Sequence, residues 1–216
     1  SAEPDLWLFA LLTLQTCEGY SGGRSYGISR MNGGPASRPF VGIVPKGRWG
    51  AHIRRDIERL IELRSEIVAN YPMYREEGGL GLVWLRPWDG NAQLTPEELD
   101  PYYVEICRRV RLNFDGTAIV AHRGASRKPR IAMPEGLNGN TGDPWTPIDR
   151  KHSKALTVDG SGFHYRRVAE LLDPSRFTPA PLQEVTPGDG SEGLELTLSV
   201  TVRGQGKTEG HHERRI

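Results

Sequence analysis

The sequence has few features of a membrane protein, a disulfide-stabilised protein or a common enzyme. No run of roughly 18 apolar residues occurs among its 216 residues, so no segment has the composition of a membrane-spanning helix. Its two cysteines, Cys17 and Cys107, are far apart and form no CxxC pair. This usage argues against a disulfide framework and a thiolate zinc site, and it is typical of a reducing compartment such as the cytoplasm.

Catalytic signatures are also absent. The sequence contains no GxxxxGK[ST] phosphate-binding loop, no HExxH pair and no nucleophile elbow, and its serines and histidines form no convincing triad. The 28 lysines and arginines nearly balance the 27 acidic residues, so the formal net charge is only +1. An anion-binding site must therefore come from local clustering of cations. We predict a binding protein with no catalytic residues and no cofactor.

One short stretch keeps an enzymatic alternative open. His211, His212 and Glu213 are adjacent metal-ligating residue types. Neighbouring residues on a strand point to opposite faces, so they seldom bind one ion together, and a polar strand start is the preferred interpretation. A metal-dependent nuclease that uses this cluster remains an alternative, as does a purely structural scaffold that binds RNA or protein; otherwise we expect no metal site.

Periodicity predicts an α+β fold of mixed helices and short antiparallel sheets with a protruding β-hairpin. We expect a buried helix over Leu6–Thr16, a helix over Arg48–Tyr71 with an isoleucine-rich apolar stripe, and a helix carrying "YYVEICRRVRL". The stretch "KALTVDGSGFHYRRVAELLDP" predicts a strand, a turn and a helix. Residues 174–193 are rich in Pro and Gly, and we interpret them as a possible connector. Strict alternation over Leu194–Val202 predicts a half-buried strand, whose return strand is only begun.

Three segments carry candidate binding residues. "EGYSGGRSYGISRMNGG" combines many glycines with Arg24, Arg30 and two tyrosines, and glycine lets a main chain approach a phosphate or base edge closely. "RGASRKPR" has four cations and no acid, as suits a loop that meets a nucleic-acid backbone. "RGQGKTEG" presents Gln205 between two glycines at a hairpin turn. Each segment has an ordinary alternative: a surface loop, a solvated charge run and a plain hairpin tip.

These segments resemble one family. "LLTLQTCEGYSGGRSYGISRMNGGPASRP", with "YGISRMNGG" as its most specific part, is similar to the glycine-loop region of CasA, the large subunit of the type I-E CRISPR surveillance complex Cascade. "VEICRRVRL", "KALTVDGSGFHYRRVAELL" and "RGQGKTEGHHERRI" resemble later parts of that subunit in the same order. The similarity covers nearly the whole chain.

The resemblance implies a non-catalytic DNA-binding subunit. CasA-type subunits recognise the protospacer-adjacent motif of duplex DNA through the minor groove, help to unwind the target for R-loop formation, and recruit a helicase–nuclease. The implied partners are double-stranded target DNA, the Cascade subunits that hold the CRISPR RNA, and the helicase–nuclease effector. No membrane is expected among the partners. Some relatives have a cysteine-rich zinc site, whose cysteines are missing here.

The resemblance assigns three elements to this chain. The glycine loop corresponds to Ser21, Gly22, Gly23 and Arg24. The lysine finger corresponds to the loop of residues 123–130, where either Arg127 or Lys128 is the candidate. The glutamine wedge corresponds to Gln205, with Gly206 beside it. Residues 1–216 are then expected to be the central, motif-reading part of a longer subunit, without its C-terminal helical bundle.

Overall fold

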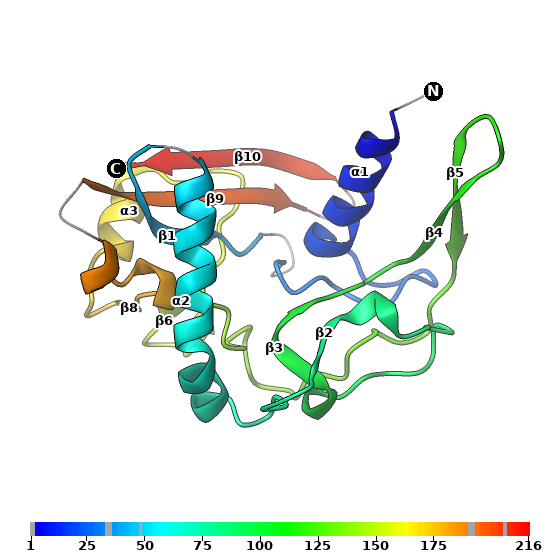
Figure 1. The fold of residues 1–216 in the computed structure, drawn as a ribbon, viewed down its shortest axis with the longest axis horizontal. Coiled ribbons are helices and arrows are strands. Elements are labelled where there is room, and N and C mark those ends of the chain that lie inside the picture. Colours follow the sequence, from blue (N-terminus) through cyan, green and yellow to red (C-terminus); the bar gives the residue numbers. More distant parts are fainter. Residues whose placement is uncertain (1–2, 33–35, 48, 190–192, 205–206) are drawn as a thin grey trace.

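The computed structural model describes residues 3–32, 36–47, 49–189, 193–204 and 207–216. In this part of the chain, α-helices and short, mainly antiparallel sheets are mixed, which confirms the predicted α+β class (Figure 1). The helices are α1 (Pro4–Cys17), α2 (Trp49–Asn70) and α3 (Tyr165–Leu171). None of these helices has both the length and the apolarity needed to traverse a lipid bilayer.

The largest sheet contains β1 (Phe40–Pro45), β9 (Leu194–Arg203) and β10 (Thr208–Arg215), with β9 in the centre and antiparallel to both neighbours. The alternation predicted for β9 is confirmed, because Leu198, Val200 and Val202 are fully buried. The return strand is longer than the sequence suggested: β10 pairs with β9 from Thr208 to Arg215.

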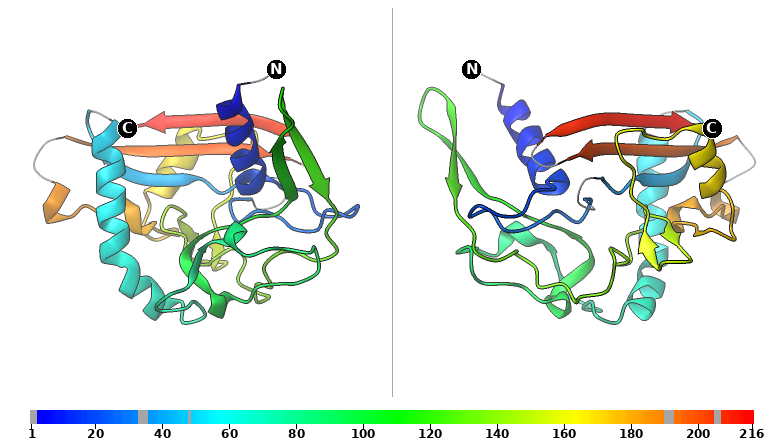
Figure 2. Two further views of the ribbon diagram at one scale, coloured as in Figure 1. Left: turned by 45° about the vertical axis from the view of Figure 1, so that its right-hand side comes forward. Right: turned by 180° about the vertical axis from the view of Figure 1, so that it is seen from behind.

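The other strands form small sheets. β2 (Leu80–Leu82) pairs in parallel with β3 (Leu99–Val104), and β4 (Arg109–Phe114) pairs with β5 (Ile119–Gly124). β6 (Ile148–Asp149) lies between β7 (Lys154–Ala155) and β8 (Phe177–Thr178). The β4–β5 hairpin extends away from the body beside α1 (Figure 2). Single 3₁₀ turns occur at Val83–Leu85, Pro96–Glu98, Pro181–Gln183 and Pro187–Asp189.

Two clusters of buried side chains form the core. One joins the inner face of β9 to Phe163, Val168 and Leu171 around α3. The other lies around β3, where Leu99 and Tyr103 meet residues that follow α2. The first cluster lies under the β1–β9–β10 sheet and the second under the β2–β3 pair, whereas β4 and β5 contribute no residue to either cluster.

The helix predicted over "YYVEICRRVRL" is wrong, because this stretch forms the end of β3 and most of β4. Its tyrosines, valines and isoleucine favour strands, and β3 alternates buried and partly buried side chains. The burial of the Leu6–Thr16 helix is also wrong: in α1 the apolar side chains of Leu6, Leu8, Phe9 and Leu12 are exposed.

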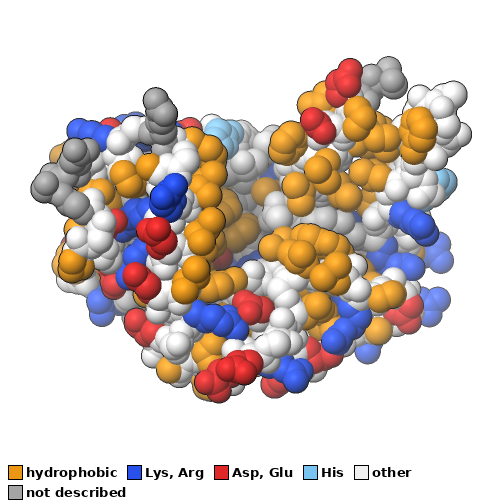
Figure 3. All heavy atoms as spheres, viewed as in Figure 1, with side chains coloured by type: hydrophobic (Ala, Val, Ile, Leu, Met, Phe, Trp, Pro, Cys, Tyr) orange, Lys and Arg blue, Asp and Glu red, His pale blue; other side chains and the backbone are white. Residues whose placement is uncertain are grey.

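Helix α2 forms where it was predicted, but only part of the predicted apolar stripe is buried: Ile67 is 4% exposed and Leu60 is partly buried. Ile53, Ile57 and Ile61 of the predicted apolar stripe are 42%, 52% and 70% exposed. Hydrophobic side chains gather along α2 beside a hollow in this face of the molecule (Figure 3). Ile53 and Ile57 line an open groove between α2 and the β1–β9–β10 sheet. Arg55, a charged residue of this helix, is buried.

Residues 174–193, predicted as a possible connector, pack against the rest of the chain where the structure describes them. Leu182 is fully buried, and Ala180 nearly so. The Arg55 guanidinium binds the Asp189 carboxylate with Nη2 to Oδ2 at 3.0 Å, and it also donates to the Leu182 and Glu184 carbonyl oxygens. An ion pair between two buried side chains fixes this segment onto α2.

Candidate nucleic-acid interface

The glycine segment, defined as residues 18–32, forms a tight turn at its exposed tip. The Gly22 N–H donates to the Ser25 carbonyl oxygen at 3.3 Å, and the Ser25 N–H donates to that of Gly22 at 2.8 Å. The two residues between them, Gly23 and Arg24, have φ values of 54° and 67°. Positive φ at both central positions is characteristic of a type I′ turn and is unusual for arginine. The turn exposes the side chains of Ser21 and Arg24.

Other glycines of this segment have an internal packing role. A Cβ at Gly19 would lie 2.6 Å from the side-chain nitrogen of Asn32, and one at Gly27 would lie 3.3 Å from the Cys107 carbonyl oxygen. The glycine content therefore has two causes: Gly19 and Gly27 permit close contacts within the protein, whereas Gly22 and Gly23 belong to the exposed turn.

The basic loop, defined as residues 123–130, lies against the glycine turn. The Ser126 N–H donates to the Arg24 carbonyl oxygen at 2.9 Å. The Ser126 hydroxyl accepts from the Tyr26 N–H at 2.8 Å and donates to the Tyr26 carbonyl oxygen at 3.1 Å. The Arg123 guanidinium also donates to the Ser25 hydroxyl. These bonds bring together two predicted binding segments about a hundred residues apart in sequence.

Only some of the predicted phosphate-binding cations are available to a partner. Arg127 and Lys128 are exposed, and neither has an ion pair with any described residue. Arg130 is 2% exposed and donates to main-chain carbonyl groups of residues 86–92. Arg30 is also committed, because it lies 3.6 Å from the Asp143 carboxylate and donates to main-chain carbonyl groups. Arg123 is exposed too, but its guanidinium donates to the Ser25 hydroxyl. The exposed cations at this interface whose side chains have no hydrogen bond or ion pair with a described residue are thus Arg24, Arg127 and Lys128.

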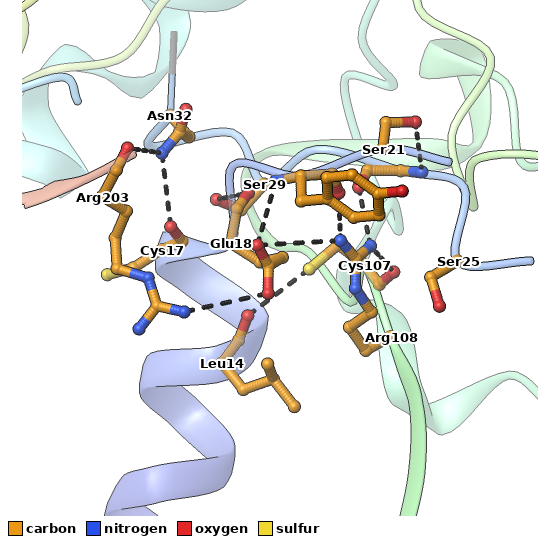
Figure 4. A network of polar contacts seen from close by, with 12 residues as sticks. Leu14, Cys17, Glu18, Ser21, Ser25, Ser29, Asn32, Cys107, Arg108 and Arg203 are labelled. Atoms are coloured by element: carbon orange, nitrogen blue, oxygen red, sulfur yellow. Dashed lines mark hydrogen bonds and ion pairs between the residues drawn. The ribbon is translucent and has the colours of Figure 1, made fainter. Parts of the chain in front are cut away.

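The predicted wedge residues, Gln205 and Gly206, lie outside the described residues. The end of β9 directly before them is attached to the glycine segment (Figure 4). The Arg203 N–H donates to the Ser37 hydroxyl at 3.1 Å, and its carbonyl oxygen accepts from the Asn32 amide at 3.3 Å. The Arg203 guanidinium lies 3.8 Å from the Glu18 carboxylate. The hairpin turn therefore starts beside the glycine segment.

A buried polar network supports this junction, and no local sequence pattern indicates it. Glu18 lies 3.8 Å from the guanidinium of Arg108 as well as from that of Arg203 (Figure 4). Arg108 also donates to the carbonyl oxygens of Tyr20, Gly27 and Cys107. The Gln15 side chain, at the end of α1, binds the main chain of Cys107 and Arg108. Burial raises the pKa of the Cys107 thiol to about 12.

The histidine cluster of the nuclease alternative does not form a metal site. The His211 ring nitrogen Nδ1 lies 3.1 Å from the Thr201 hydroxyl, and the Glu213 carboxylate accepts from Arg215 at 3.1 Å. His212 packs against Gly162 instead. Over the part of the chain that the structure describes, no three His, Cys, Asp or Glu side chains are placed to hold a metal ion together. The geometry gives this alternative no support.

Comparison of the chain with protein-family models, with curated proteins and with solved structures finds no match. The function must therefore be argued from the residues and their arrangement.

Proposed function

We propose that this protein is a non-catalytic DNA-binding subunit of a type I-E CRISPR interference complex, of the CasA type. It reads the protospacer-adjacent motif of duplex DNA through the minor groove, helps to open the target for R-loop formation, and recruits the helicase–nuclease. Its partners are the target duplex, the Cascade subunits that hold the CRISPR RNA, and that effector, all in the cytoplasm.

One observation carries this proposal: the glycine turn and the basic loop form a single exposed surface. The hydrogen bonds of Ser126 join them, and the exposed cations Arg24, Arg127 and Lys128 extend from this surface. A duplex phosphate backbone binds such cations by releasing counterions, and a narrow minor groove attracts them further. Minor-groove edges differ mainly by the guanine amino group, so a small, bare turn suffices for coarse discrimination.

The attachment of the hairpin base to the glycine segment supports the same function. Arg203 is fixed to Glu18, Asn32 and Ser37, so the turn that contains Gln205 begins near the surface just described. Insertion of a side chain between base steps helps to unstack them, and phosphate contacts and guide pairing offset its cost. The assignment of Gln205 itself depends on sequence alone.

Duplex binding at several salt concentrations tests the proposal. We expect Arg127→Gln combined with Lys128→Gln to weaken binding and to reduce the slope of log K against log salt by about 0.9 for each lost phosphate contact. Arg166→Gln is the matched control, because the Arg166 side chain is 84% exposed on α3. An unchanged slope in the double variant would contradict the phosphate-binding role of the basic loop.

Motif recognition requires the assembled complex. Duplexes that differ only in the motif should bind a complex containing this subunit with different affinities. Gln205→Ala should leave assembly intact and slow target opening. Motif-independent capture would favour the scaffold alternative, and normal R-loop formation by Gln205→Ala would remove the wedge assignment.

A further inference from the structure

A cavity of about 380 Å³ lies at the edge of the proposed interface. Ser21, Gly27 and Ile28 of the glycine segment line it, as does Pro129 of the basic loop. Ser21 and Ile28 are exposed, so the cavity opens on the surface that carries the candidate DNA-binding residues. Its volume is at the lower end of the ~300–1,000 Å³ typical of small-molecule sites. The cavity thus suits one small ligand.

The arginines in the wall of this cavity have different surroundings. Arg30 is held by the protein: it donates to the Pro101 and Thr141 carbonyl oxygens, lies 3.6 Å from the Asp143 carboxylate and lies 4.7 Å over the Tyr103 ring, although its Nε has no hydrogen-bond partner. Arg38 makes no ion pair and its guanidinium forms no hydrogen bond with any described residue, although its Nε is buried. Burial lowers the pKa of Arg38. Arg38 therefore presents hydrogen-bond donors that the described protein does not use.

Glu105 supplies an acceptor in the same wall. Its carboxylate accepts from the main chain of Arg30, and it has no ion pair with the described residues. Burial raises the pKa of Glu105 to about 7, and the nearby charge of Arg30 opposes this change only in part. Donors and acceptors that are removed from water without partners destabilise a protein, and a ligand with matching groups relieves that cost.

The chemistry of the cavity matches a nucleobase. Ile28, Ile131 and Met133 offer apolar contact to the faces of a flat ring, while Arg38 and Glu105 can bind its edge. Guanine has two acceptors, O6 and N7, that suit an arginine, together with N–H donors that suit a carboxylate. We propose that this cavity binds a single unstacked nucleobase, with guanine preferred.

This inference rests on the proposed function in one respect, namely that the bound base comes from the target duplex. If the protein opens duplex DNA at the glycine turn, an extruded base lies next to the mouth of the cavity, and its capture would oppose re-stacking. A free nucleoside has the same chemistry, so the experiment must separate the two sources.

Guanosine binding to the purified chain, measured by calorimetry, tests the cavity without DNA. We expect Glu105→Gln and Arg38→Gln each to weaken guanosine binding about tenfold, the effect of losing a hydrogen bond to a charged group. Arg166→Gln should bind as the wild type does, and adenosine should bind more weakly than guanosine. Glu105→Gln preserves side-chain shape, so it remains informative if Arg38→Gln fails to fold. Failure of the wild type to bind guanosine, or equal binding by Glu105→Gln, would overturn the proposal.

A duplex with a fluorescent guanine analogue beside the motif identifies the source. An extruded base predicts increased emission with the wild type and a smaller increase with Glu105→Gln at equal duplex occupancy. Guanosine binding without duplex binding would reject the proposed function and leave a nucleoside site. If the protein binds the duplex but does not bind guanosine, and the emission does not depend on Glu105, the nucleobase site is rejected and the proposed function stands.

Discussion

Replacing Glu18 by glutamine should destabilise the protein and loosen the junction between the glycine segment and the β9–β10 hairpin. The Glu18 carboxylate lies 3.8 Å from the guanidinium groups of both Arg108 and Arg203, and the residue is only 8% exposed. Glutamine has nearly the same shape and can still accept the hydrogen bond from the Tyr20 N–H, which is 2.9 Å long. Glu18→Gln therefore removes mainly the charge.

The expected magnitude follows from these distances. At an effective dielectric constant of about 20, each pair at 3.8 Å contributes roughly 4 kcal/mol before desolvation is counted. Removing one partner of a buried ion pair usually costs about 3–5 kcal/mol. Because Arg108 keeps its carbonyl acceptors, we expect the lower end, about 3 kcal/mol. For a chain of this length, that change lowers Tm by roughly 6–12 °C.

Thermal unfolding followed by circular dichroism at neutral pH measures this effect. Glu213→Gln is the matched control, because it breaks an exposed ion pair with Arg215 that should contribute less than about 1 kcal/mol. A double-mutant cycle with Arg203→Met then isolates the coupling between Glu18 and Arg203. The reasoning is refuted if Glu18→Gln lowers Tm no more than Glu213→Gln does.

Three further predictions concern other parts of the fold. Hydrogen bonds from the Arg55 guanidinium lower the pKa of the Asp189 carboxylate to about 2. The stability that this carboxylate contributes is therefore full above about pH 4 and is lost as the pH falls toward 2. Asp189→Asn should reduce the loss of stability between about pH 4 and pH 2, as measured by acid unfolding. Cys107, with its raised pKa, should react with iodoacetamide far more slowly than Cys17 in the native protein, and equal rates would contradict the burial. Gly27→Ala should cost more unfolding free energy than Gly47→Ala, by about 1 kcal/mol, because both have positive φ but only Gly27 faces a carbonyl oxygen.

The elements with a clear period were predictable from the sequence. The alternation in β9 specifies which of its residues enter the core, and the helical spacing in α2 specifies a long helix. The strands within residues 99–114 were missed because a stretch of tyrosine, valine and arginine has no strong period, so tertiary pairing decides its conformation.

The candidate site was predictable only in part. Composition identified the glycine turn and the basic loop, because glycine and clustered cations leave a local signal. These two segments meet through Ser126, which lies about a hundred residues from the glycine turn. Arg30 and Arg130 form hydrogen bonds within the protein, also with residues distant in the chain, and so are not available to a partner. No local pattern separates a solvated arginine from a buried one.

The sequence by itself determined the α+β class, the helix α2, the strand β9 and the absence of common catalytic motifs. Only the tertiary structure decided which face of α2 is buried. The helical period determines which residues share a face of α2, but whether that face is buried depends on which other segments pack against it. Arg55 is inside because Asp189, 134 positions later, supplies its counter-charge. Glu18 likewise gains its role from Arg108, directly before β4, and Arg203, at the end of β9, since ion pairs between distant residues exist only once the chain has folded.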